Sequence, residues 1–497
     1  MKYYSTRDKA VGMESAQAIQ MGLSRDGGLL TPEVIPQIDR AFLESLVGER
    51  YQVRAAKVMG LYLTDYTYEE LLDFAEKAYG PDKFDTDAVA PVRKVDGNTH
   101  CLELWHGPTS AFKDMALQML PQLLSAALRK TGEDKTVCIL VATSGDTGKA
   151  AMEGFADVPQ TKILVFYPKD GVSAVQEAQM VTQDGENVGV CAVVGNFDDA
   201  QAGVKRIFSD ETIRAALADR GYLLSSANSI NWGRILPQVV YYISAYCDLV
   251  RDGEIAMGDK VNFCVPTGNF GDILAAYYAW RMGLPVGRLI CASNRNNVLT
   301  DFFKKNGTYD KNRDFYTTSS PSMDILISSN LERLLFMASG QDDQMVAELM
   351  GRLSEDGSYQ VAAEVFEKIS ADFDAGCCED AQAAETIRTL WEQEHYLCDT
   401  HTAVAVRVYE EYRARTGDET PTVIASTASP FKFCRAVIEA LGGTLERDDI
   451  SQLAVLSGLT GVEAPAPLAA LADQAPRFDR VVDKAEILST VALLKGL

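Results

Sequence analysis

The sequence predicts an α/β fold with doubly wound, mostly parallel sheets. Short apolar runs rich in β-branched residues alternate with amphipathic helical runs, as in βαβ units. The runs expected to form strands are 136–142, 162–167, 187–194, 260–265, 288–292 and 422–425. Four of them end in small polar residues, and ligands of such sheets bind outside the carboxyl ends of strands. The pattern therefore predicts a ligand site at those ends.

The chain has 497 residues, which is long for one core and suggests about three domains. Residues 1–92 are expected to be mostly helical, with amphipathic runs at 41–47 and 68–75. We place the other two regions at 93–260 and 261–497. In the last region, 341–400 is expected to be helical, and the segment after 468 a surface helix.

Composition excludes several classes of function. The net charge of −23 argues against nucleic acid or an anionic membrane as partner, and it means that an anionic substrate needs a locally basic pocket. Ten cysteines without C-x-x-C spacing indicate reduced thiols in the cytoplasm. Four histidines without H-E-x-x-H spacing make a metal site unexpected. No signal peptide or long apolar run is found in the sequence.

Lys113 is the residue whose sequence context most specifically indicates a catalytic role. It follows the turn Gly107-Pro108 and stands at the start of the helix expected over 115–120. Apolar neighbours and the helix dipole both favour a neutral amine over an ammonium at this position. A neutral amine is what carbonyl chemistry needs, including a Schiff base with pyridoxal phosphate. Taken alone, a lysine in a turn is more often an ordinary surface residue.

Five segments follow one another in an order that resembles a known family. They are 106–114, which contains Lys113, then 144–148, 228–234, 268–272 and 426–433. With the amino-terminal segments 3–7 and 22–29, they resemble threonine synthases, which are fold-type II pyridoxal-phosphate enzymes with a tryptophan synthase β-like architecture. The resemblance implies pyridoxal 5'-phosphate as cofactor, with Lys113 as its Schiff-base lysine and catalytic residue.

The same resemblance gives each predicted region a task. Residues 1–92 correspond to the N-terminal threonine-synthase module. Residues 93–260 would carry the cofactor lysine and bind substrate, and residues 261–497 would bind the cofactor phosphate and end in helices.

The loop Gly268-Asn269-Phe270-Gly271-Asp272 opens a helix after a strand. Two glycines let successive N–H groups point inward, and the helix dipole adds attraction for an anion. We expect this loop to bind the cofactor phosphate, although an ordinary strand-to-helix turn would explain the loop taken alone.

Ser144-Gly145-Asp146-Thr147-Gly148 has the same strand–loop–helix context. Its hydroxyl and N–H groups could bind the α-carboxylate of a substrate, and the resemblance places Asp146 near the cofactor ring. A plain helix cap would explain one polar residue here but not three.

Thr427 stands at a strand end, and the resemblance implies that its hydroxyl faces the pyridine nitrogen of the cofactor. A neutral partner leaves that nitrogen less protonated than a carboxylate would. The family usually has His-Pro where this chain has Ser429-Pro430.

Asn231 and Arg234 lie three residues apart at a helix start, so they share a face if that turn is helical. The planar guanidinium suits phosphate oxygens, and the resemblance implies that this segment binds the phosphate of the substrate. Lys169, at another strand end, is a further candidate for that anion.

The resemblance implies a carbon–oxygen lyase that converts O-phospho-L-homoserine and water to L-threonine and phosphate, the last step of threonine biosynthesis. Two alternatives use the same cofactor, namely a phospholyase that releases 2-oxobutyrate and a serine/threonine dehydratase. A non-enzymatic phosphate-binding protein is a third alternative, which leaves Lys113 without a purpose. No macromolecular partner is expected beyond a second copy of the chain, as a monomer or homodimer.

Overall fold

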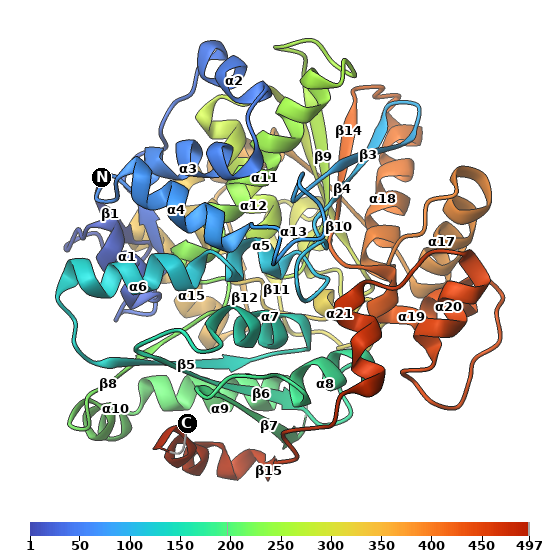
Figure 1. The fold of residues 1–497 in the computed structure, drawn as a ribbon. Coiled ribbons are helices and arrows are strands. Elements are labelled where there is room, and N and C mark those ends of the chain that lie inside the picture. Colours follow the sequence, from blue (N-terminus) through green and yellow to red (C-terminus); the bar gives the residue numbers. More distant parts are fainter. Residues whose placement is uncertain (196, 496–497) are drawn as a thin grey trace.

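The computed structural model describes residues 1–195 and 197–495. Within them, two sheets form the frame of the molecule (Figure 1). The strands of the larger sheet are β3 (Val92–Asp96), β4 (Thr99–Glu103), β9 (Val261–Pro266), β10 (Val286–Ser293), β13 (Phe373–Cys377) and β14 (Thr422–Ser426). The strands of the smaller sheet are β5 (Thr136–Ala142), β6 (Thr161–Pro168), β7 (Val188–Val194), β8 (Tyr222–Ser225) and β15 (Val481–Asp483).

The larger sheet has the order β13-β10-β9-β14-β4-β3, and only its β3–β4 pair is antiparallel. The smaller sheet has the order β15-β7-β6-β5-β8 and is parallel throughout. The six predicted strands are all present, so the predicted α/β class with mostly parallel sheets is confirmed.

Two expectations for the carboxyl-terminal half are wrong. Residues 341–400 contain two strands beside the expected helices: β13, a partly buried edge strand of the larger sheet, and β12 (Ser358–Gln360), which belongs to a separate pair. The segment after 468 contains β15, which pairs with the end of β7. All three strands are short, and a short strand at a sheet edge has too few residues to show a periodicity.

The amino-terminal module packs helices around a small antiparallel pair, β1 (Tyr3–Ser5) with β2 (Leu30–Pro32). Its helices are α1 (Ser15–Met21), α2 (Arg40–Val47), α3 (Tyr51–Tyr62) and α4 (Tyr68–Ala78). Asp39 caps α2, and Thr67 forms a capping box at the start of α4, which explains where both helices begin.

The remaining elements surround the two sheets. The helices are α5 (Lys113–Leu117), α6 (Leu120–Thr131), α7 (Asp146–Phe155), α8 (Ala174–Val181), α9 (Phe197–Ser209), α10 (Glu211–Ala218), α11 (Trp232–Arg251), α12 (Gly271–Met282), α13 (Val298–Lys304), α14 (Leu331–Ala338), α15 (Asp343–Glu355), α16 (Ala363–Ser370), α17 (Asp380–Glu394), α18 (Thr400–Thr416), α19 (Cys434–Ala440), α20 (Gln452–Thr460) and α21 (Ala466–Ala469). The shorter elements are the 3₁₀ turns η1 (Pro321–Met323), η2 (Pro430–Phe433), η3 (Ala470–Asp473) and η4 (Lys484–Lys495), and the antiparallel pair β11 (Thr308–Asp310) with β12 (Ser358–Gln360).

Helix α11 crosses the centre of the molecule (Figure 1) and is buried along nearly its whole length. It packs against α3, α5 and α12, so it connects the amino-terminal module to the larger sheet. The predicted domain boundaries at 92 and 260 stay a prediction. Each sheet combines strands from two separate stretches of the chain. The larger sheet combines β3 and β4 with β9, β10, β13 and β14, and the smaller sheet combines β5 to β8 with β15. In the described part of the chain, no helix is long and apolar enough to cross a membrane.

Candidate active site

Residues from four of the five predicted motifs line one cavity. Its lining residues are Phe112, Lys113, Ser229, Arg234, Gln238, Pro266, Thr267, Gly268, Asn269, Phe270, Gly271, Asp272, Ser322, Met323, His401 and Thr427. The carboxyl ends of β9 and β14 and the starts of α5, α11 and α12 supply most of them. The cavity therefore lies where parallel sheets place their ligands.

Lys113 is the first residue of α5 and remains partly accessible, with its Nζ 4.0 Å from the centroid of the Phe112 ring. Burial, together with the charge of Arg234, lowers the pKa of Lys113 to about 8. The Phe112 N–H donates to the carbonyl of Thr427 over 2.8 Å, so the lysine segment is attached to the strand end that carries Thr427.

The glycine loop has the backbone of a close-approach site. Phe270 adopts a left-handed φ of 62°, a conformation that is uncommon for residues other than glycine. A Cβ on Gly268 would lie 2.9 Å from the Ser322 carbonyl oxygen, and one on Gly271 would lie 3.3 Å from Asn330 Nδ2. Both positions therefore leave little room for any side chain.

Arg234 is a buried cation in the wall of the cavity. Its side chain is buried and donates to the carbonyl of Ala227, while its Nε finds no partner among the described residues. Burial lowers the pKa of Arg234 to about 10. Because a buried cation needs compensation, this guanidinium fits an anion in the cavity.

Asp272 also lines the cavity. It accepts hydrogen bonds at Oδ1 from Tyr241 and Tyr242, and its Oδ2 has no partner in the described part of the chain. Burial raises the pKa of this carboxyl. Its unpartnered oxygen is a second polar atom that a ligand could satisfy.

The structure does not bring Asn231 and Lys169 into the cavity. Asn231 caps α11: its Oδ1 accepts from Gly233 N–H over 2.9 Å, and its Nδ2 donates to the carbonyl of Ile19 over 3.1 Å. Lys169 is exposed at the end of β6. Direct binding of an anion by either residue stays a prediction.

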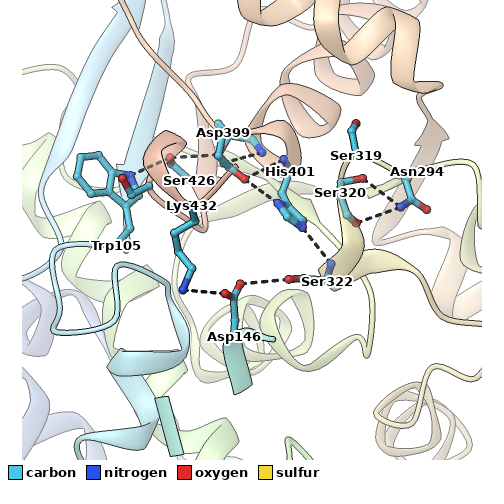
Figure 2. Close-up of polar contacts among 12 residues, drawn as sticks. Trp105, Asp146, Asn294, Ser319, Ser320, Ser322, Asp399, His401, Ser426 and Lys432 are labelled. Carbon is cyan, nitrogen blue, oxygen red and sulfur yellow. Dashed lines mark hydrogen bonds and ion pairs between the residues drawn. The ribbon is translucent and has the colours of Figure 1, made fainter. Parts of the chain in front are cut away.

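The Ser144–Gly148 loop adjoins the cavity without lining it. Gly145 adopts a φ of 130°, which requires glycine, and the Thr143 hydroxyl accepts the N–H groups of Gly145 and Gly148. Ser144 and Thr147 remain partly exposed. Asp146 reaches the cavity wall through Ser322, whose hydroxyl donates to it over 3.2 Å (Figure 2).

The sequence analysis missed His401, a cavity residue held between two partners. Its Nδ1 lies 2.7 Å from Asp399 Oδ2, and its Nε2 accepts the N–H of Ser322 over 3.1 Å (Figure 2). Asp399 also caps α18. The available signal in the sequence is this Asp-x-His pattern at the start of α18.

These observations fit pyridoxal phosphate. One cavity contains a partly accessible amine of lowered pKa, a glycine-lined helix start and a buried guanidinium whose Nε has no partner among the described residues. Residues 93–428 match the model of the family "Pyridoxal-phosphate dependent enzyme". The chain is therefore a fold-type II enzyme of this class, and pyridoxal 5'-phosphate is its cofactor, as the sequence predicted.

Two further family models identify the family to which the chain belongs within this class of enzymes. Residues 2–79 match "Threonine synthase N terminus", and residues 402–491 match "Threonine synthase, C-terminal". Threonine synthase from Pseudomonas aeruginosa is 42% identical over 448 residues, which are 88% of this chain and 90% of that protein. The chain belongs to the threonine synthase family.

Solved structures agree with this assignment. Pyridoxal-phosphate-bound threonine synthase from Brucella melitensis is 37% identical, with a TM-score of 0.87 over 100% of this chain and 99% of that one. The human protein threonine synthase-like 1 is 42% identical over 436 residues, 86% of this chain. This chain spans 58% of the length of that human relative.

Proposed function

We propose that this chain is a threonine synthase that converts O-phospho-L-homoserine and water to L-threonine and phosphate. The observation that carries the proposal is the buried Arg234, with its free Nε, in the same cavity as Lys113 and a glycine-rich helix start. One cavity thus offers two separate anion binders. This suits a phosphorylated substrate beside a phosphorylated cofactor.

In this proposal, Lys113, the loop 268–272 and Thr427 would hold the cofactor, with Asp146 near its ring. When bound, pyridoxal phosphate supplies an electron sink for negative charge that develops on the substrate. The backbone N–H groups at the start of α12 would bind its phosphate, and the Thr427 hydroxyl would be the neutral partner of its ring nitrogen.

The chain's own residues then orient the substrate and move protons. The neutral amine of Lys113 takes the proton from Cα and carries protons in the later steps. Cβ loses a proton as phosphate leaves Cγ, Cγ then gains a proton, and water adds at Cβ. Arg234 holds the phosphate that leaves Cγ, and Asn231 keeps the first turn of α11 in place beneath it. Ser144, Gly145 and Thr147 bind the α-carboxylate, with Lys169 as a further candidate ligand for the phosphate.

The chain's ligands are small molecules in this proposal, and its compartment is the cytoplasm. The cysteines of the described chain are free, and most are buried in apolar surroundings, which fits a reducing environment. We propose that the chain acts as a monomer or homodimer.

Product analysis tests the proposal. The protein with pyridoxal phosphate is incubated with O-phospho-L-homoserine, and L-threonine, phosphate and 2-oxobutyrate are quantified. Equal amounts of threonine and phosphate are expected. Release of 2-oxobutyrate instead would assign the phospholyase activity, and turnover of L-serine or L-threonine alone would assign the dehydratase.

A further inference from the structure

Lys432 is a fully buried lysine to which the proposed chemistry gives no task. It lies in η2, five residues after Thr427. Its Nζ contacts Asp146 Oδ1 at 2.8 Å, the Thr109 carbonyl at 2.9 Å and Gln179 Oε1 at 2.8 Å. An ammonium has three N–H donors, so all of them are used.

These contacts join two segments that carry cavity residues to a third segment that adjoins the cavity. Thr109 lies four residues before Lys113, and Asp146 opens α7 in the loop 144–148. Lys432 itself belongs to the segment of Thr427. The hydrogen bond from the Phe112 N–H to the Thr427 carbonyl already joins the segments of Lys113 and Thr427. The additional segment that Lys432 attaches to them is the loop 144–148, which follows β5 of the smaller sheet.

Asp146 is the other centre of this network (Figure 2). Besides Lys432 it accepts from Gln176 Nε2 over 2.9 Å and from the hydroxyl of Ser322, which lines the cavity. Burial alone would raise the pKa of Asp146, but the charge and hydrogen bond of Lys432, together with the hydrogen bond from Gln176, lower the pKa to about 2. Asp146 therefore stays a carboxylate, which fixes the loop rather than exchanging protons.

We propose that Lys432 is a positioning residue, which holds the loop 144–148 against the cavity by fixing the carboxylate of Asp146. Burying an ion pair has a large desolvation free energy, and an apolar pair of similar volume would hold two segments together at least as well. A buried pair with directed hydrogen bonds adds a defined geometry at the loop. The inference rests on the proposed function, in which this loop binds the substrate carboxylate.

The main test compares Lys432→Met with the parent protein loaded with pyridoxal phosphate. Misplacement of the loop is expected to lower kcat/KM for O-phospho-L-homoserine by about 100-fold, mainly through a higher KM. Cofactor affinity, measured by titration of its visible absorption, should change little. Hydrogen–deuterium exchange of the amides of 143–149 should become faster, while exchange in β6 stays as in the parent.

The double variant Asp146→Asn with Lys432→Met separates positioning from charge compensation. The double variant leaves no unpaired charge buried, whereas Lys432→Met leaves the Asp146 carboxylate unpaired. The unfolding temperature of the double variant should therefore be closer to the parent value than the unfolding temperature of Lys432→Met. The kcat/KM of the double variant should nevertheless stay low and its loop exchange fast. Parent-like kinetics and exchange in the double variant would overturn the proposal, since Lys432 would then only neutralise Asp146.

Arg54→Met is the matched control, because Arg54 and Asp248 form a buried ion pair at 2.7 Å between α3 and α11. It should lower the unfolding temperature without changing exchange in 143–149. Parent-like exchange and kinetics in Lys432→Met would also overturn the proposal. If the parent makes no threonine, the proposed function fails, but the exchange experiment still tests Lys432 because it needs no substrate.

Discussion

Arg234 and Lys113 line the same cavity, and the charge of Arg234 lowers the pKa of Lys113. Burial is the larger cause, and together they bring the pKa from its ordinary value of 10.5 to about 8. The guanidinium of Arg234 thus has two effects. It favours the neutral amine of Lys113 that carbonyl chemistry needs, and it attracts an anion to the cavity.

This relationship predicts how cofactor binding depends on pH. The rate at which the cofactor-free protein acquires the visible absorption of bound pyridoxal phosphate should rise about tenfold per pH unit and level off above about 8, because only the neutral amine reacts. Arg234→Leu removes a nearby cation, so the midpoint should move to higher pH. Lys113→Ala should never develop this absorption. An unchanged midpoint in Arg234→Leu would show that the two side chains are not coupled.

Gly271→Val tests the cofactor-phosphate loop. The added side chain would crowd Asn330 and Ile235 at 3.3 Å and obstruct the approach of an anion to the start of α12. We expect a sharp fall in cofactor affinity with the fold retained, measured by titration and by circular dichroism. Gly351→Val is the control, since nothing lies within 4 Å of its Cβ position. Equal cofactor affinities in the two variants would show that the loop is an ordinary turn that does not bind the cofactor phosphate.

Thr427→Asp tests the neutral partner of the ring nitrogen. A carboxylate there should favour a protonated ring, shift the visible spectrum and divert part of the product toward 2-oxobutyrate. Thr427→Ser keeps a hydroxyl and should behave like the parent. If the spectrum and product ratio of Thr427→Asp match the parent, Thr427 has only a structural role at the end of β14.

Arg234→Leu separates the two phosphates. Loss of a buried, charge-assisted contact should cost about 2–4 kcal/mol of transition-state binding, which lowers kcat/KM for O-phospho-L-homoserine by roughly 10²–10³. Cofactor affinity at pH 9 should change little, and inhibition by free phosphate should weaken. Loss of cofactor with otherwise intact substrate kinetics would mean that Arg234 binds the cofactor phosphate instead.

Much of the fold and part of the site could be predicted from the sequence. The strand 136–142 is confirmed to the residue, because seven apolar or β-branched residues between turns leave little ambiguity. Lys113, the loop 268–272, Arg234 and Thr427 meet in one cavity because each follows a strand or opens a helix that faces it.

The remaining features depend on contacts between distant parts of the chain. His401 lies beside Ser322 only because α18 and η1 come together in the fold. The sequence suggests that Asn231 is a ligand, yet its amide nitrogen donates to the carbonyl of Ile19, which is distant in the sequence, and to the nearby carbonyl of Ser226. No periodicity or local motif encodes such a pairing.

The central claim is that phosphate leaves by cleavage of its bond to carbon and that water then adds at Cβ. The most direct measurement is the reaction of O-phospho-L-homoserine in ¹⁸O-labelled water, with mass analysis of both products. We predict one ¹⁸O atom in the hydroxyl group of L-threonine and none in the released phosphate. Label in the phosphate would indicate hydrolysis at phosphorus, and it would contradict the proposed function.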